Sequence, residues 1–286
     1  MQYVSSRGET KKITSAQAIV KGIAGDGGLY VPTMIPRVDK KWRQGLTQMN
    51  YCERALAILK LFLTDYSEQE LKICIQEAYK SNNFSHADIA PIVTVNEKMS
   101  VLELWHGPTA AFKDMALQLL PRLLTTALKK LDSKDEIVIL TATSGDTGKA
   151  ALAGFKDVEQ TKIIVFYPRD GVSTVQKLQM VTQEGNNTFV VSVDGNFDDA
   201  QNGVKDIFNN KKFNAELAKK EVQLSSANSI NWGRLVPQIV YYFSAYADLV
   251  KQGVINEDEP INFVVPTGNF GNILAGYYAW QMGLPV

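Results

Sequence analysis

The sequence is poor in the residues that bind metal ions and form disulfides. Its 286 residues include 2 histidines and 2 cysteines. Cys52 and Cys74 lie too far apart for the paired spacing of a zinc site and are too few for a disulfide framework, which favours a reducing compartment. His86 and His106 leave little for a zinc or di-iron centre. We therefore predict no metal site and a cytoplasmic location.

An excess of charge of one sign and a long apolar run are also absent. The chain carries 30 Lys and Arg against 30 Asp and Glu. Proteins that bind nucleic acids or anionic membranes carry clusters of excess Lys and Arg residues, which this sequence lacks. No stretch approaches the roughly 20 apolar residues that cross a membrane, and residues 1–8 lack a secretory pattern. These absences exclude nucleic acid and membrane as predicted partners.

The first 95 residues carry the signals of capped helices. Thr14 can cap a short helix, and Asn50 precedes an apolar-periodic run over 51–63. Ser67 begins a capping box ahead of a second such run over 71–79. We predict packed amphipathic helices here, with no chemistry of their own.

From about residue 91, short β-rich runs alternate with helical stretches. This order predicts an α/β fold in which parallel sheets carry helices on both faces. Predicted strands cover 92–95, 101–104, 137–141, 162–167, 188–193, 222–224 and 262–265, and predicted helices cover 113–131, 148–155, 174–184, 199–210, 233–250 and a segment from 272. Ligands of such sheets bind beyond the carboxyl ends of strands, so the loops after strands are the candidate site.

The loop 141–149 follows a predicted strand and opens a helix. Its small residues and glycines leave backbone N–H groups and hydroxyls at the helix N-terminus, which favours an anion. It is not a Walker loop, because Thr143 and Ala150 stand where that motif needs Gly and Ser or Thr. The alternative is an ordinary strand-to-helix turn with hydroxyl caps.

A second glycine-rich turn, 266–272, also lies between a predicted strand and a helix. Gly268 and Gly271 permit a close approach of the backbone, and the helix dipole behind them favours a phosphate. One such turn is weak evidence. Two of them at strand-to-helix junctions predict a site that holds two anionic groups.

The segment 104–114 places a lysine at the start of a predicted helix. The positive end of the helix dipole is expected to lower the pKa of the Lys113 ammonium. A lysine that is neutral near physiological pH is suited to imine formation. The alternative is that Lys113 is a solvated helix residue.

Together these segments resemble the longer subfamily of threonine synthases. The matching motifs are 106–114, 143–148, 225–234 and 266–272, and residues 3–8 and 26–30 match the N-terminal pattern of the family. The order and approximate spacing fit over nearly the whole chain. The resemblance implies a lyase of the tryptophan-synthase-β type (fold type II) that uses pyridoxal 5'-phosphate (PLP). Its reaction converts O-phosphohomoserine and water to threonine and phosphate, the last step of threonine biosynthesis.

The resemblance also implies the residues of the site. Lys113 forms an aldimine with PLP and then moves protons at Cα and Cβ of the substrate. The cofactor phosphate is bound by Gly268, Asn269, Phe270, Gly271 and Asn272. The substrate is bound by Thr143, Ser144, Gly145, Asp146, Thr147, Ser225, Asn228, Asn231 and Arg234. Arg234 is the first candidate for the substrate phosphate, because a guanidinium binds phosphate through two parallel hydrogen bonds.

Two assignments stay open at this point. The wider fold type often carries Asn where this chain has Asp146, which leaves the partner of that carboxylate undecided. His106 either assists the reaction or stabilises its own turn.

The same resemblance implies a division into domains. Residues 1–95 form a mainly helical region, 134–221 form a small α/β domain, and 96–133 with 222–286 belong to a large PLP-binding domain. The family continues beyond the position of Val286, with a Ser or Thr that contacts the pyridine nitrogen. We therefore expect an incomplete large domain and poor activity from this chain alone. The alternatives are a PLP-dependent phospho-lyase acting on a phosphorylated hydroxy-amino acid and a non-catalytic PLP-binding homologue.

Overall fold

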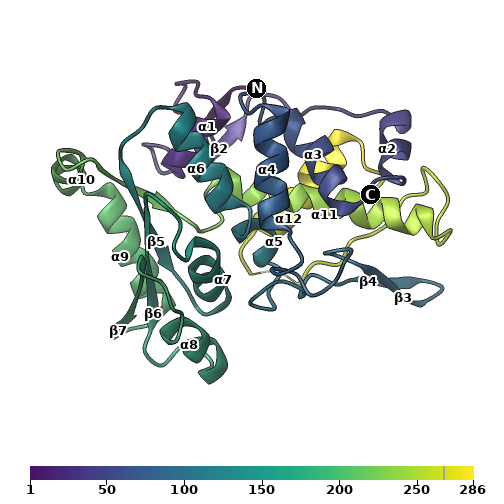
Figure 1. Ribbon diagram of the computed structural model, residues 1–286. Helices are drawn as coiled ribbons and strands as arrows, with labels where there is room; N and C mark the ends of the chain where they lie inside the picture. The colour runs from purple at the N-terminus through teal and green to yellow at the C-terminus, as the bar shows by residue number, and fades with distance from the viewer. Residues whose placement is uncertain (267) are drawn as a thin grey trace.

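The computed structural model describes residues 1–266 and 268–286, so Thr267 of the glycine-rich turn 266–272 lies outside the described residues. Its elements in chain order are β1 (Tyr3–Ser5), α1 (Ser15–Lys21), β2 (Tyr30–Pro32), α2 (Lys40–Leu46), α3 (Tyr51–Phe62), α4 (Glu68–Ala78), β3 (Ile92–Asn96), β4 (Met99–Leu102), α5 (Asp114–Leu117), α6 (Leu120–Lys130), β5 (Glu136–Ala142), α7 (Asp146–Phe155), β6 (Thr161–Pro168), α8 (Thr174–Val181), β7 (Thr188–Val193), α9 (Phe197–Asn209), α10 (Lys211–Ala218), β8 (Val222–Ser226), α11 (Trp232–Lys251) and α12 (Gly271–Met282). Figure 1 shows the sheet of β5 to β8 with α7 to α10 on one side of the molecule, and most other helices beside it.

The first helices begin where their caps predict. The side chains of Thr14, Asn50 and Ser67 each accept a hydrogen bond from a backbone N–H of the first turn of α1, α3 and α4. Each cap is part of a capping box, which satisfies donors that the helix itself leaves unpaired. The three helices therefore begin at the residues whose caps predicted them.

A parallel sheet of four strands, in the order β7-β6-β5-β8, forms the second part of the fold. Alternate residues of a strand face opposite sides of a sheet. Ile137 and Ile139 of β5 accordingly belong to the main core, which also includes residues of α7. Leu140 of β5 instead packs with Ala200 and Val204 of α9. Helices therefore cover both faces, which confirms the predicted α/β class.

The predicted parallel order is wrong at 92–104. β3 and β4 pair antiparallel, with Ile92 opposite Leu102. Two residues, Glu97 and Lys98, separate these strands, and a parallel pair needs a crossover of about a dozen residues or more. The two strands form a hairpin apart from the parallel sheet, as Figure 1 shows.

Three further predicted elements differ from the structure. The helix predicted over 113–131 is divided into α5 and α6, and Pro121, which lacks a backbone N–H, lies in the first turn of α6. The helix predicted over 199–210 is followed by α10, which Asn210 caps through the N–H of Phe213. The strand predicted over 262–265 is not formed. Val264 is 93% exposed, and among the described residues no strand pairs with this segment.

α11 is the central helix of the fold. Nearly all its residues are buried, as expected for a helix that is apolar on all sides. The ring of Trp232, at its first residue, lies 5.4 Å from Tyr3, 5.5 Å from Phe62 and 5.4 Å from Tyr278. α11 thereby joins the N-terminal helices to α12 and places the loop before it, 227–231, after strand β8.

The boundary predicted at 221 separates β8 from the small α/β domain. In the structure β8 pairs with β5, with Ile139 opposite Ser225. No helix of the described residues is long and apolar enough to cross a membrane.

Candidate active site

A buried carboxylate holds the turn that carries Lys113. The backbone N–H and hydroxyl of Thr109 donate to the two oxygens of Asp114, at 2.8 and 2.7 Å. Asp114 is 0% exposed, and its burial raises the pKa of its carboxyl, although its hydrogen bonds with Thr109 oppose that rise. Ala110, in the same turn, has a positive φ of 52°. The turn therefore fixes the backbone of Lys113 before any ligand binds.

The Lys113 ammonium lies in a partly closed site with one anionic neighbour. Its Nζ is 3.4 Å from Oδ2 of Asp146 and 4.3 Å from the centre of the Phe112 ring. The side chain is 14% exposed, and burial lowers the pKa of the ammonium. Asp146 opposes this shift, whereas Arg234 and Lys149 add to it.

The predicted direction of the Lys113 pKa shift is confirmed, but the predicted cause is not the main one. α5 has 4 residues, and Lys113 is its N-cap. So short a helix adds little field from its dipole, because the macrodipole sums over aligned peptide units. Burial is the first cause of the shift.

The loop at the start of α7 is closed by one of its own hydroxyls. Thr143 Oγ1 accepts hydrogen bonds from the N–H groups of Gly145 and Gly148, both at 2.9 Å. Gly145 has a φ of +143°, a conformation that side chains disfavour. Thr143 and Thr147 are buried, and Ser144 is exposed. Thr143 thus has a capping role, while Ser144 offers the accessible hydroxyl of this loop.

Asp146 links three other side chains at the N-terminus of α7. Besides Lys113, its carboxylate lies 3.4 Å from Nζ of Lys149 and accepts a hydrogen bond of 2.6 Å from Nε2 of Gln176. Burial raises the pKa of Asp146, but Lys113, Gln176 and Lys149 outweigh it and hold the pKa below its ordinary value. The sequence gives no motif for Gln176, which lies in α8. Its position at N3 behind the Ser173 cap is the one local signal.

A glycine allows the two helices of this site to meet. A Cβ placed on Gly154 of α7 would lie 2.1 Å from the carbonyl oxygen of Leu117 in α5. Only a residue without a side chain permits so close an approach. Gly154 therefore helps to keep Asp146 within reach of Lys113.

The predicted residues between 225 and 234 are packed beside this site and are largely bonded to the backbone. Asn228 Nδ2 donates to the carbonyl of Ala142, 3.2 Å away at the end of β5. Asn231 caps α11, and its Nδ2 donates to two carbonyls, of Ile19 and Ser226. The Ser225 hydroxyl is buried without a hydrogen-bond partner among the described residues.

Arg234 is 2% exposed, and its guanidinium donates to the Ala227 carbonyl. Burial lowers the pKa of Arg234 to about 10, and Tyr241 and Asp114 oppose that shift. Arg234 therefore supplies positive charge near Lys113, and its Nε–H makes no hydrogen bond to the described residues.

The second predicted loop begins α12 and is open to solvent. Gly268, Asn269 and Phe270 are exposed, and a Cβ on Gly268 would meet no atom within 4 Å. A Cβ on Gly271 would lie 3.0 Å from Cβ of Ser229, so the loop adjoins the segment 225–234.

Asn272 anchors the loop to the core. Its Oδ1 accepts hydrogen bonds from the hydroxyls of Tyr241, at 2.5 Å, and Tyr242, at 2.9 Å. Both tyrosines lie in α11 and are buried. They have no motif in the sequence, and their role follows from the packing of α11 against α12.

His106 lies in a turn bonded to its neighbours. Its Nε2 is 2.7 Å from a carboxylate oxygen of Glu103, and its Nδ1 is 3.2 Å from the Ser85 hydroxyl. Its ring centre is 5.1 Å from that of His86. These contacts favour the turn-stabilising interpretation of His106.

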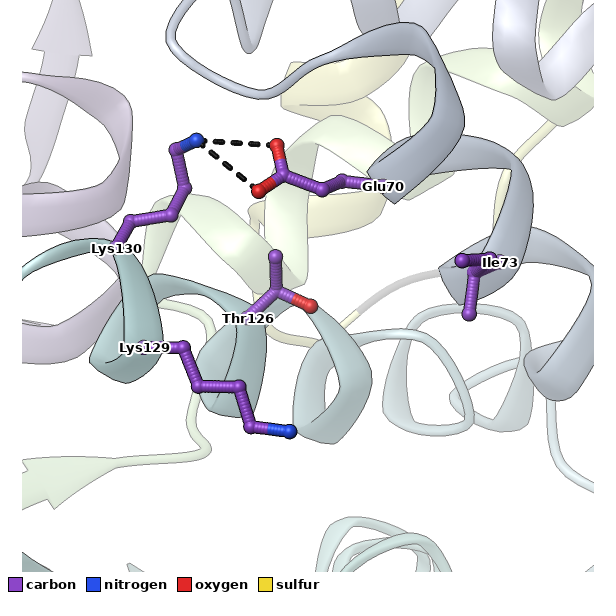
Figure 2. Close-up of a pocket in the computed structure, with 5 residues that line it drawn as sticks. All are labelled: Glu70, Ile73, Thr126, Lys129 and Lys130. Carbon is purple, nitrogen blue, oxygen red and sulfur yellow. Dashed lines mark hydrogen bonds and ion pairs between the residues drawn. The ribbon is translucent and has the colours of Figure 1, made fainter.

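A surface hollow between α4 and α6 is separate from these residues. Figure 2 shows the Lys130 ammonium facing the Glu70 carboxylate, at 3.0 and 3.1 Å. Ile73, Thr126 and Lys129 complete its lining, which contains none of the predicted site residues. Nor do the described residues form a group of three or more potential metal ligands.

Comparison with known proteins identifies relatives of this chain. Residues 2–79 match the family described as "Threonine synthase N terminus". A threonine synthase of Schizosaccharomyces pombe is 38% identical over 293 residues, and the match covers all of this chain. Threonine synthase-like 1 of Homo sapiens is 41% identical over 280 residues. The crystal structure of PLP-bound threonine synthase from Brucella melitensis superposes with a TM-score of 0.88 at 41% identity, again over the whole chain.

The relatives are longer than this chain. It spans 55% of the Schizosaccharomyces pombe protein, 37% of the human protein and 59% of the Brucella melitensis chain. The likeness therefore concerns slightly more than half of a threonine synthase.

Proposed function

We infer that this chain, a relative of the threonine synthases, binds PLP and takes part in converting O-phosphohomoserine and water to threonine and phosphate. The observation that carries the proposal is the half-buried amine of Lys113, held beside the Asp146 carboxylate where strand β5 is followed by α7. Ligands of parallel α/β sheets bind at such strand ends. The proposal extends to this chain an activity that the names of its longer relatives carry.

The residues present fit PLP. Burial lowers the pKa of Lys113. An amine with a lowered pKa is more readily neutral and can form an imine with a carbonyl group such as that of PLP. The turn 268–272 opens a helix of 12 residues, and the space around Gly268 suits a phosphate. Bound there, PLP would supply the electron sink for chemistry at the substrate carbons.

The protein's own residues would then bind the substrate and move protons. We propose that Lys113 moves protons at Cα and Cβ of the substrate. The exposed Ser144 hydroxyl and the Thr147 hydroxyl would meet the substrate carboxylate at the start of α7. Loss of a phosphate dianion needs positive charge and hydrogen-bond donors nearby, which Arg234 and Asn228 would supply.

The remaining predicted site residues would shape the loop or contact the substrate. Thr143 and Gly145 would act by shaping the loop, since Thr143 Oγ1 caps the Gly145 N–H. Both amide protons of Asn231 bind carbonyls, and its Oδ1 accepts a hydrogen bond from the Gly233 N–H, which among the described residues leaves one Oδ1 lone pair for a ligand. The Ser225 hydroxyl has no hydrogen-bond partner among the residues that the structure describes.

The division into a small domain over 134–221 and a large PLP-binding domain from 96–133 and 222–286 also stays a proposal. The pairing of β8 with β5 favours moving the second boundary past Ser226. A cytoplasmic location and the low activity of the chain alone stay predictions.

Borohydride reduction after incubation with PLP tests the cofactor assignment. Peptide mapping should find a phosphopyridoxyl group on Lys113 and none there in Lys113→Ala. Lys177→Ala, which changes a lysine outside the site, should leave the adduct in place. Absence of the adduct from the Lys113 peptide of the unchanged chain would remove the basis of the proposal.

Product analysis with O-phosphohomoserine separates the proposed reaction from its nearest rival. Formation of threonine and phosphate supports synthase chemistry. Accumulation of 2-oxobutyrate without threonine would favour a phospho-lyase that uses the same Lys113 and anion site. A PLP adduct with no turnover of any phosphorylated hydroxy-amino acid would agree with a non-catalytic homologue and equally with the low activity predicted for this chain alone.

A further inference from the structure

A second lysine lies beside Lys113 and has no part in the reaction described above. Lys149 lies in the first turn of α7 and is 8% exposed. Its Nζ is 3.4 Å from Oδ1 of Asp146. A buried ammonium is unfavourable unless it is paired with an anion, so its position calls for a reason.

Asp146 is shared between the two lysines. Its Oδ2 is 3.4 Å from Lys113 and its Oδ1 is 3.4 Å from Lys149, while Gln176 donates to Oδ1 at 2.6 Å. Close ion pairs with hydrogen bonds have N···O distances of about 2.7–2.9 Å. Neither lysine therefore forms a close pair with the carboxylate, and the amide of Gln176 takes the shortest contact.

We propose that Lys149 is a positioning residue for Lys113. The Gln176 amide binds Oδ1 of Asp146, and the Lys149 ammonium attracts the same oxygen from 3.4 Å. Together they keep the carboxylate from closing a tight ion pair on Lys113 and make the Lys113 ammonium easier to deprotonate. This inference rests on the proposed function, in which Lys113 reacts as an amine.

The charges around Lys113 agree with this role. α7 contributes Asp146 and Lys149, α11 contributes Arg234, and the adjacent Asp114 lies in α5. Lys149 and Arg234 both lower the pKa of Lys113, whereas Asp146 raises it. Lys149 also interacts electrostatically with the buried Asp114. Loss of the Lys149 charge removes a repulsion and frees Asp146 for Lys113, and both changes favour the protonated amine.

Trace acetylation across a range of pH measures this effect without cofactor or substrate. The rate of acetylation of Lys113, read by peptide mass spectrometry against the exposed Lys12, follows the fraction of neutral amine. In Lys149→Met, which keeps most of the side-chain volume, we expect the midpoint to rise by about one pH unit, so that Lys113 reacts roughly tenfold more slowly below the midpoint. Lys149→Arg, which keeps the charge, should leave the midpoint near that of the unchanged chain.

Two controls separate charge from packing. Lys156→Met makes the same substitution just past the end of α7, at a side chain that is 41% exposed and pairs with Glu184, and should not move the midpoint. If Lys149→Met does not fold, as judged by circular dichroism, Lys149→Gln carries the same test.

An unchanged midpoint in Lys149→Met, or equal shifts in Lys149→Met and Lys149→Arg, would overturn the inference. The proposed function fails separately, when PLP and borohydride leave no adduct on Lys113 of the unchanged chain. A chain that takes the adduct but shows no Lys149 effect would refute only the positioning role.

Discussion

The proposed site has two ends, one around Lys113 and one at the turn 268–272, and they differ in how many contacts hold their residues in place. Around Lys113, buried Asp114 fixes the turn and Thr143 closes the facing loop. Asp146 there contacts the side chains of Lys113, Lys149 and Gln176. The turn 268–272 instead has exposed residues at 268–270 and is anchored to the core at Asn272. Phe270 is 66% exposed, and Val264, earlier in the same stretch of chain, is 93% exposed. The amine end is thus positioned before ligand binding, whereas the phosphate end depends more on what binds there.

The largest test of this contrast is to remove the amine itself. In Lys113→Ala we expect turnover of O-phosphohomoserine to fall by about 10²–10⁴-fold or more, because the proton-transfer group is lost. Steady-state phosphate release measures the effect, and Lys177→Ala provides the matched control. Appreciable residual turnover would contradict the role of Lys113 as the base.

A second test disturbs the scaffold of the amine end. Gly154→Ala should lower the free energy of unfolding by about 1–3 kcal/mol, because its Cβ would overlap the Leu117 carbonyl. Urea denaturation gives the value. Gly203→Ala, in α9 with no atom within 4 Å of the new Cβ, should be neutral or stabilising. Equal effects of both substitutions would show that the close approach of α5 and α7 is unimportant.

A third test asks what the buried charge costs the fold. Since burial lowers the folded-state pKa of Lys113 below its unfolded value, the protonated amine destabilises the folded chain at neutral pH. That destabilisation is relieved as pH rises through the folded pKa toward the unfolded one. Lys113→Met should therefore raise the free energy of unfolding by about 0.5–2 kcal/mol at pH 7.

The pH dependence checks the third test. The advantage of Lys113→Met should shrink as the pH of the urea series is raised above neutrality. A stability difference that stays constant over this range would point to packing rather than charge.

The smallest expected effect lies at the phosphate end. Phe270→Ala should change the free energy of unfolding by no more than about 0.5 kcal/mol, as for other exposed side chains. We nevertheless expect weaker PLP binding, measured by fluorescence titration, because Phe270 is part of the turn that would bind the cofactor phosphate. A large loss of stability would mean that this end is organised as firmly as the other.

Local signals were sufficient where a few neighbouring residues decide the structure. The caps at Thr14, Asn50 and Ser67 start helices in the predicted places. The apolar runs of β5 to β8 form the predicted parallel sheet. The segment 262–265 has the same apolar character yet forms no strand, because a strand needs a partner that the pattern of one segment cannot specify.

The site shows the same limit. Motifs located Lys113 and Asp146, but the contact between them depends on the approach of α5 and α7 at Gly154. Gln176 and Tyr241 lie in other helices without any motif, so only tertiary packing reveals them. The sequence places Lys149 at the end of the loop 141–149, but only the structure shows that it is buried and lies near Asp146.

The burial of α11 has a consequence for the order in which the molecule opens. A helix enclosed on nearly all sides exposes its amides only when the surrounding structure separates, so its hydrogen exchange should report global unfolding. Arg234 lies in the first turn of that helix and Asn231 caps it. The segment proposed to receive the substrate phosphate is therefore tied to the slowest-exchanging unit of the chain, and local fluctuations elsewhere would leave it in place.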